Sequence, residues 1–168
     1  MVRLFATSLC LTWGLMALGN AAKKEPKKAE KGVEACSFEL HGNDMMKFTG
    51  KDGSDVKEIK IPKSCSKFAI ELVHVGKQPK NVMGHNFFIS ETKDMQSLIG
   101  EALKDPKAEY ILPASKVLAG SAKLLGGGDK ESIHVDLAKL RKTSGDLSYF
   151  CSFPGHFGLM NGKVILEK

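Results

Sequence analysis

Three side chains near the C-terminus are of the types that bind transition metals: Cys151, His156 and Met160. They lie in one stretch, CSFPGHFGLM, between two segments that favour β-strands. Pro154 and Gly155 favour a tight turn there, and the proline limits the freedom of the loop before any metal arrives. A thiolate, an imidazole and a thioether can therefore converge in one compact loop. Soft sulfur donors combined with imidazole are typical of copper sites.

The blue-copper arrangement of these donors needs a second histidine beside the cysteine and a distant axial methionine. His85 is the candidate, because it lies in NVMGHNF next to a segment that favours a β-strand. Gly84 precedes it, and a glycine lets its backbone carbonyl approach a metal closely. The sequence thus predicts a copper site built from the His85 segment and the C-terminal loop.

The number of cysteines is compatible with a metal-bound thiol. The chain has four cysteines, and Cys10 lies in an apolar N-terminal run that we interpret as a signal. Three then remain, Cys36, Cys65 and Cys151, which is an odd number for an exported chain. Two can pair and one is left over. A metal would protect that remaining thiol.

The N-terminus has the composition of a secretory signal. Arg3 precedes the almost uncharged run Leu4–Leu18, and the small residues that follow offer a cleavage site. The run is shorter than the roughly 20 apolar residues of a membrane span. We therefore predict a signal peptide over residues 1–21, a periplasmic location and no membrane span in the mature protein.

Residues 22–35 are predicted to be a Lys-rich flexible leader before a single domain over residues 36–168. The stretch KKEPKKAEKG cannot bury enough apolar surface to offset the entropy of ordering. Its five lysines and two glutamates supply +3 of the formal net charge of +6. No aromatic residues are interleaved with the basic ones, so we expect no nucleic-acid binding. We expect a monomer.

The domain shows mostly the period-two alternation of short β-strands. The predicted strands are Lys67–His74, Ser132–Leu137, Asp146–Cys151 and Gly162–Glu167. One segment differs, since Asp94–Lys104 has apolar residues at helical spacing and Pro106 follows it. Many strands with one short helical insertion predict an all-β, Greek-key β-sandwich. The run Gly126–Gly128 is predicted to be a turn, because the Lys-Ser/Thr pair of a phosphate-binding loop does not follow it.

Over residues 36–168 the chain resembles the azurins, bacterial members of the cupredoxin family. The resemblance rests on six ordered blocks: CSFELHGNDMMKF, SCSKF, KNVMGHNF, DMQSLI, KLLGGGDKESI and YFCSFPGHFGLMNGKVIL. It implies the cupredoxin-like sandwich with one type 1 copper per chain. It also implies equatorial ligands His85, Cys151 and His156, and axial donors Met160 and the Gly84 carbonyl oxygen.

The same resemblance assigns supporting roles. It implies that Asn86 and the backbone N–H of Phe153 act on the Cys151 sulfur, and that Cys36 and Cys65 form a disulfide. It further implies an apolar docking patch around His156, made of Met46, Met83, Leu103, Leu159 and Phe153, with the ring edge of His156 at the surface. The expected partners are redox proteins such as c-type cytochromes, nitrite reductase or amine dehydrogenase.

The sequence departs from the common azurin pattern at two places. The segment between Met46 and Cys65 is longer, and Lys51–Ser54 is predicted to form an extra turn. Phe87 stands where several family members carry a buried tryptophan. The one tryptophan of the chain, Trp13, lies in the predicted signal. Neither departure touches a predicted ligand.

The expected function is electron transfer, and other interpretations stay open at this point. Cys151 can be an inert buried thiol, Met160 a core residue, and His74 a satisfied buried imidazole. A periplasmic copper carrier or chaperone would use the same soft donors. A structural zinc site fits the nitrogen and sulfur donors but gives Met160 no role. We expect no enzyme activity, because no paired His-x-His motif offers a second copper centre.

Overall fold

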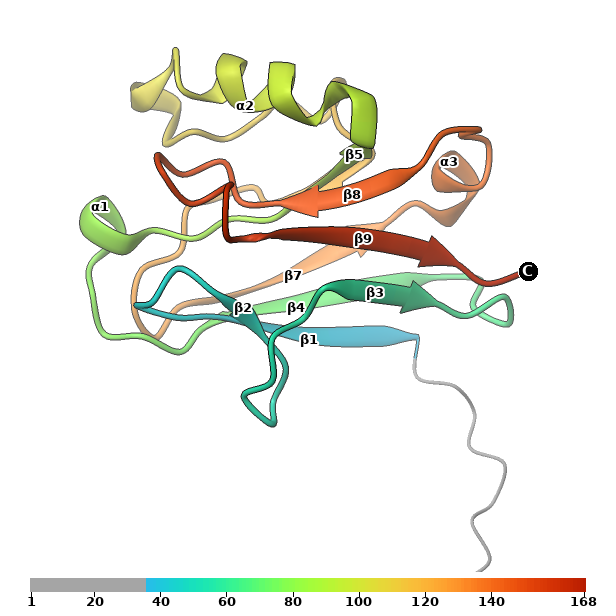
Figure 1. Ribbon diagram of the computed structural model, residues 1–168, viewed down its shortest axis with the longest axis horizontal. Helices are drawn as coiled ribbons and strands as arrows, with labels where there is room; N and C mark the ends of the chain where they lie inside the picture. The colour runs from blue at the N-terminus through green and yellow to red at the C-terminus, as the bar shows by residue number, and fades with distance from the viewer. Residues whose placement is uncertain (1–35) are drawn as a thin grey trace, which may run out of the picture. The chain divides into compact units, whose positions relative to one another are not determined.

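The computed structural model describes residues 36–168, so the predicted signal and leader lie outside the described residues. The strands form two mixed sheets that pack face to face (Figure 1). The four-stranded sheet has the order β2 (Phe48–Thr49), β1 (Ser37–Gly42), β4 (Phe68–His74) and β7 (Lys130–Val135). The five-stranded sheet has the order β3 (Glu58–Ile61), β9 (Asn161–Leu166), β8 (Leu147–Phe150), β5 (Phe88–Glu91) and β6 (Ala119–Gly120).

The predicted Greek-key β-sandwich is confirmed, and its core follows from the alternating sequence pattern. In β4, Phe68, Ile70 and Leu72 are buried while the residues between them are half-buried. They meet the inner face of the five-stranded sheet, to which β3 contributes Ile59 and Ile61. The chain passes repeatedly from one sheet to the other, which makes β1 and β4 parallel neighbours, as are β3 and β9.

The predicted helix is present as α2 (Met95–Ala102), preceded by a 3₁₀ turn η1 (Thr92–Asp94). Its buried residues Leu98, Ile99 and Ala102 form a second apolar cluster with Phe88 and Phe150 on the outer face of β5 and β8. This cover explains why all four residues of β8 are buried. The structure adds two one-turn helices, α1 (Lys80–Met83) and α3 (Leu137–Leu140), and a 3₁₀ turn η2 (Pro106–Ala108).

One predicted strand is displaced. The pattern over Ser132–Leu137 predicted a strand, whereas β7 spans Lys130–Val135 and Leu137 begins α3. The Asp136 side chain accepts a hydrogen bond from the Lys139 amide and so caps the helix directly after the strand. The apolar side chain of Leu137 is buried in either conformation, so periodicity alone did not distinguish them.

The loops of the sandwich gather at two opposite ends, which we call the α1 end and the disulfide end. At the α1 end lie α1, the β1–β2 turn and the β8–β9 connection (Figure 1, left). At the disulfide end lie the β3–β4 turn, α3 and the C-terminus (Figure 1, right). There the predicted disulfide joins Cys36 to Cys65, with Cα atoms 5.6 Å apart.

Two further observations concern the loops and the helices. The predicted extra turn at Lys51–Ser54 is present, closed by the Gly53 amide on the Gly50 carbonyl at 3.0 Å. Gly53 has φ 80°, which favours glycine at this position. Within residues 36–168, no helix combines the length and the apolar character needed to cross a membrane.

Candidate metal centre

Three predicted ligands converge at the α1 end. The donor atoms of His85, Cys151 and His156 all lie within 4.8 Å of one another. The side chains are 0%, 0% and 2% exposed, respectively. Cys151 is outside any disulfide, and its Sγ lies 3.9 Å from Nδ1 of His156. Two residues of one loop thus meet a histidine that lies far away in sequence.

The backbone and ring of His85 are fixed by two separate contacts. Its amide donates to the Leu125 carbonyl at 3.0 Å, and the Leu125 amide donates back at 2.8 Å. Its ring nitrogen Nε2 lies 2.9 Å from the Asn43 carbonyl oxygen, so Nε2 carries the proton. Nδ1 therefore keeps its lone pair. It is buried and has no hydrogen-bond partner among the described residues.

The orphaned Nδ1 is the observation that tests the fit of a metal. A buried polar atom without a partner costs free energy, so native structures rarely keep one without a function. Here the atom belongs to a group of three donors, two imidazoles and a thiol, which is the set that copper prefers. The residues present therefore fit a copper ion. The fixing of one ring nitrogen by a carbonyl is also how ligating histidines are usually oriented.

Short backbone hydrogen bonds shape the loop from Cys151 to Met160. The Cys151 amide donates to the Met160 carbonyl at 3.0 Å, which closes the loop at its base. Inside it, the His156 amide donates to Phe153 at 3.1 Å and the Met160 amide donates to His156 at 2.8 Å. Gly155 has φ 78°, a conformation that other residues adopt only with strain. The Met160 side chain is fully buried.

Burial sets the protonation of the three donors in the absence of metal. It lowers the pKa of His85 to about 3 and that of His156 to about 4, because the charged imidazolium is poorly solvated inside the protein. Both rings are therefore neutral at pH 7. Burial also raises the pKa of the Cys151 thiol to about 11, although backbone N–H groups of Asn86 and Phe153 oppose that shift. Metal binding must consequently release the thiol proton.

A buried hydrogen-bond network fixes the residue after Cys151. The Ser152 amide donates to the Asn86 side-chain oxygen at 2.8 Å, and the Asn86 side-chain nitrogen lies 2.9 Å from Ser152 Oγ. Ser152 Oγ in turn donates to the Tyr110 carbonyl at 2.6 Å. Sequence reasoning identified Asn86 but missed Ser152 and Tyr110. No local pattern points to Tyr110, whose φ of 60° is set by the loop after α2.

Gly84 and His74 stand directly beside His85. A Cβ on Gly84 would lie 2.4 Å from the Lys80 carbonyl oxygen, so the close packing of this corner requires glycine. The His74 ring stacks on His85 with centroids 4.3 Å apart. Its Nε2 donates to the Met83 carbonyl at 2.7 Å, and its Nδ1 accepts from the Gly76 amide at 3.1 Å. Both ring nitrogens of His74 thus have partners.

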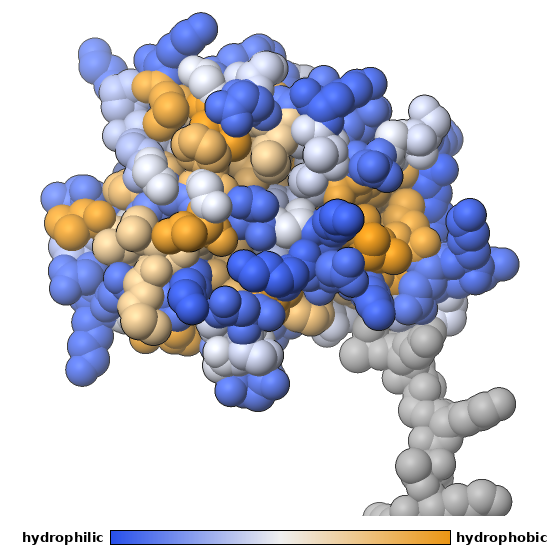
Figure 2. Space-filling model, in the orientation of Figure 1, coloured by the Kyte–Doolittle hydropathy of each residue, from blue (hydrophilic) through white to orange (hydrophobic). Residues whose placement is uncertain are grey.

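The predicted docking-patch residues lie on the loops of the α1 end. Leu103 and Leu159 are 41% and 56% exposed, while Met46 and Met83 are half-buried. Sequence reasoning missed two neighbours that are also exposed, Met45 at 68% and Val82 at 53%. Their positions beside Met46 and Met83 were the available signal. Apolar surface is visible at this end in Figure 2.

One implication of the resemblance differs from the structure. An exposed ring edge was expected for His156, but only 2% of the residue is exposed. Phe153 packs against the ring with centroids 4.7 Å apart and is itself 8% exposed. A partner would therefore contact the residues that surround His156 more than the ring itself.

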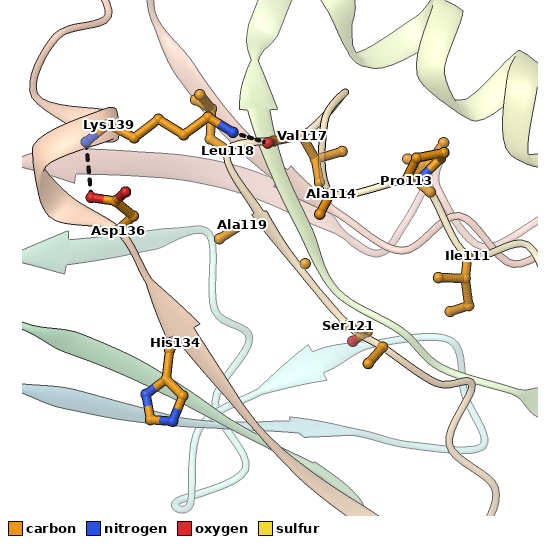
Figure 3. Close-up of a pocket in the computed structure, with 13 residues that line it drawn as sticks. Ile111, Pro113, Ala114, Val117, Leu118, Ala119, Ser121, His134, Asp136 and Lys139 are labelled. Carbon is orange, nitrogen blue, oxygen red and sulfur yellow. Dashed lines mark hydrogen bonds between the residues drawn. The ribbon is translucent and has the colours of Figure 1, made fainter.

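A separate hollow lies between β6 and the β7–α3 connection, away from the three donors (Figure 3). Its polar side chains are already used. Lys139 Nζ donates to the Val117 carbonyl at 2.7 Å, and Ser121 Oγ accepts from the Phe87 amide at 3.0 Å. The lining near α3 therefore offers few free groups to hold a ligand.

Comparisons with known proteins agree with the fold and the donor set. The sequence pattern of the copper binding proteins of the plastocyanin/azurin family matches residues 34–167. The chain is 41% identical over 151 residues to an azurin of Bordetella pertussis, covering 89% of this chain and 95% of that protein. It is 37% identical over 133 residues to an azurin of Pseudomonas aeruginosa, covering 79% and 85%.

A third relative carries a different name. Outer membrane protein H.8 of Neisseria gonorrhoeae is 39% identical to the chain over 131 residues, which is 78% of this chain and 67% of that protein.

A β-sandwich with a buried cysteine and two histidines at one end defines a single-metal cupredoxin. The chain belongs to the plastocyanin/azurin family of copper binding proteins. Its cofactor is copper, which the cluster of His85, Cys151 and His156 fits.

Proposed function

We propose that this protein is a periplasmic electron carrier that passes one electron at a time through a single type 1 copper. The ligands are His85, Cys151 and His156, with Met160 and the Gly84 carbonyl oxygen as weak axial donors. The observation that carries the proposal is the buried Nδ1 of His85, which has no partner among the described residues and belongs to a three-donor cluster. The copper, when bound, supplies the Cu(I)/Cu(II) couple.

The residues of this chain do the rest by holding the donors still. The Leu125 bridge and the Asn43 carbonyl hold the His85 ring, and the Asn86–Ser152 contacts hold the backbone next to Cys151. A site that barely changes shape between oxidation states has a small reorganisation cost, which favours fast electron transfer. The neutral histidines also need no proton release when metal binds.

Burial of all three donors favours a carrier of electrons over a carrier of copper. A protein that hands over metal needs donors that a partner can reach, whereas these side chains are at most 2% exposed. We therefore propose that the protein is not an enzyme and that its partners are other redox proteins. They would dock on the apolar α1 end in weak, short-lived complexes.

The absorption spectrum of the purified protein after addition of Cu(II) tests the proposal. A thiolate-to-Cu(II) charge-transfer band in the visible range is expected of a type 1 site. A protein that binds Cu(II) tightly without such a band would contradict it and support the copper-carrier alternative. Mass spectrometry of the protein recovered from the periplasmic fraction tests the location, because the mass should lack the predicted signal.

A further inference from the structure

The two ends of the sandwich differ strongly in charge. At the disulfide end, segments 59–70 and 137–145 contain six cationic side chains and no Asp or Glu: Lys60, Lys63, Lys67, Lys139, Arg141 and Lys142. All six are exposed, and none forms an ion pair with another described residue. At the C-terminus, Lys168 and Glu167 cancel. We call these six side chains the cationic face.

The acidic residues nearest in sequence to this face are few. Asp136 precedes α3, and its carboxylate accepts the Lys139 amide. Asp146 follows the second segment at the start of the run into β8. The α1 end is close to neutral by comparison. Its connections, residues 42–47, 75–86, 103–110, 124–129 and 151–160, contain five lysines and four acidic residues.

The cationic face is held together by the fold. The Arg141 guanidinium donates to the carbonyls of Pro62, Lys63 and Cys65, at 3.4, 3.3 and 3.2 Å. These bonds join α3 to the β3–β4 turn, and the disulfide joins the same turn to Cys36. Two segments that are about 75 residues apart in sequence thus present their charges together. Such an arrangement is unfavourable unless an anionic surface or salt compensates it.

The sequence before Cys36 extends the same charge. Lys23–Lys31 contains five lysines and two glutamates, and this stretch joins the domain at the disulfide end. We propose that the cationic face and this stretch bind a bilayer surface rich in anionic phospholipid headgroups, which would leave the copper end directed away from the membrane. The inference goes beyond electron transfer and does not depend on it.

The chemistry of the face favours headgroups over a built anion site. Five of the six cations are lysines, which act as point charges on flexible stems. The single arginine uses its guanidinium to bind backbone carbonyls, so it is not free to form a fork around one phosphate. Spread lysines suit a diffuse array of charged lipids, whose attraction falls off within a Debye length of about 10 Å at 0.1 M salt.

Vesicle binding by the secreted, copper-loaded protein tests the proposal. We expect sedimentation with phosphatidylglycerol vesicles, no sedimentation with phosphatidylcholine vesicles, and release as salt is raised. The variant Lys63→Gln/Lys67→Gln/Lys142→Gln should lose affinity by about fivefold per lysine, or roughly 100-fold. Arg141 is left intact because it holds the turn. The visible band and the disulfide should be unchanged, which shows that the variant is folded.

A matched triple variant at the other end is the control. Lys77→Gln/Lys104→Gln/Lys107→Gln removes the same charge from the α1 end and should change affinity less than about threefold. Equal losses in the two triple variants would overturn the proposal, because net charge alone would then explain binding. A loss confined to Lys24→Gln/Lys27→Gln/Lys28→Gln would also overturn it, as would absence of binding to phosphatidylglycerol.

The orientation has its own readout. Acetylation of lysines on vesicle-bound protein, followed by mass spectrometry, should show protection at Lys63, Lys67 and Lys142. Lys77 and Lys104 should stay as reactive as in free protein. Protection at the α1 end instead would overturn the proposed orientation. Neither experiment depends on electron transfer, so its failure is distinguishable from a failure of the proposed function.

Discussion

The α1 end and the disulfide end are built from the same two sheets but carry different devices. At the α1 end, three donors from distant segments converge under loops whose exposed residues include Val82 and Leu159. At the disulfide end, a covalent cross-link and the Arg141 contacts close the sandwich, and the surface is cationic. The comparison teaches that the metal chemistry and the cross-linking of the fold lie far enough apart to be changed independently.

The largest expected effect at the α1 end is the loss of the thiolate. Cys151→Ser should abolish the visible band entirely, because a hydroxyl oxygen does not give the covalent charge transfer of a thiolate. The fold should persist, since the substitution removes no apolar contact beyond one sulfur atom. Absorption and circular dichroism spectra measured together check this. A variant that stays blue would show that Cys151 is not the ligand.

The second prediction compares an apolar residue from each region. Val82→Lys should slow electron self-exchange by two orders of magnitude or more, because two α1 ends must meet and bury an unpaired ammonium. Ile165→Lys is the control, since Ile165 is 37% exposed on β9, outside the α1 loops. NMR line broadening in mixtures of oxidised and reduced protein gives the rates. Equal rates in the two variants would contradict docking through the α1 end.

The third prediction removes the cross-link at the disulfide end. Cys36→Ser/Cys65→Ser should lower the free energy of unfolding by about 3–4 kcal/mol, as expected for a closed loop of this length in the chain-entropy model. The visible band should remain, because no donor lies at that end. Denaturant unfolding of the metal-free protein measures the first effect and the spectrum of the copper form measures the second. A lost band would show that the two ends are coupled.

The smallest predicted effect concerns the axial methionine. Met160→Leu should keep the visible band and raise the reduction potential, because losing a weak donor destabilises Cu(II) more than Cu(I). Every tenfold loss of Cu(II) binding relative to Cu(I) corresponds to about 59 mV. Voltammetry against Leu159→Ala, a neighbour with an exposed side chain, provides the matched control. A lowered potential would remove Met160 from the proposed ligand set.

Much of the fold followed from local patterns. Alternation in β4 and helical spacing in α2 predicted those elements closely, because each has one buried face. The pattern was less decisive at Leu137, where a buried apolar residue suits a strand or a helix, and the Asp136 cap decided for the helix. The short helix α1 has no buried residue and left no periodic signal.

The sequence by itself determined the donor types, their spacing and the odd cysteine. Cys151, His156 and Met160 lie in one short loop, so their proximity follows from chain connectivity and the turn at Gly155. Only the tertiary structure decided that His85 joins them with Nδ1 free, since the Asn43 carbonyl that holds Nε2 is 42 residues away in sequence. The same holds for the nearly complete burial of His156 and for the gathering of charges at the disulfide end. Long-range packing fixes these features, and no local pattern encodes it.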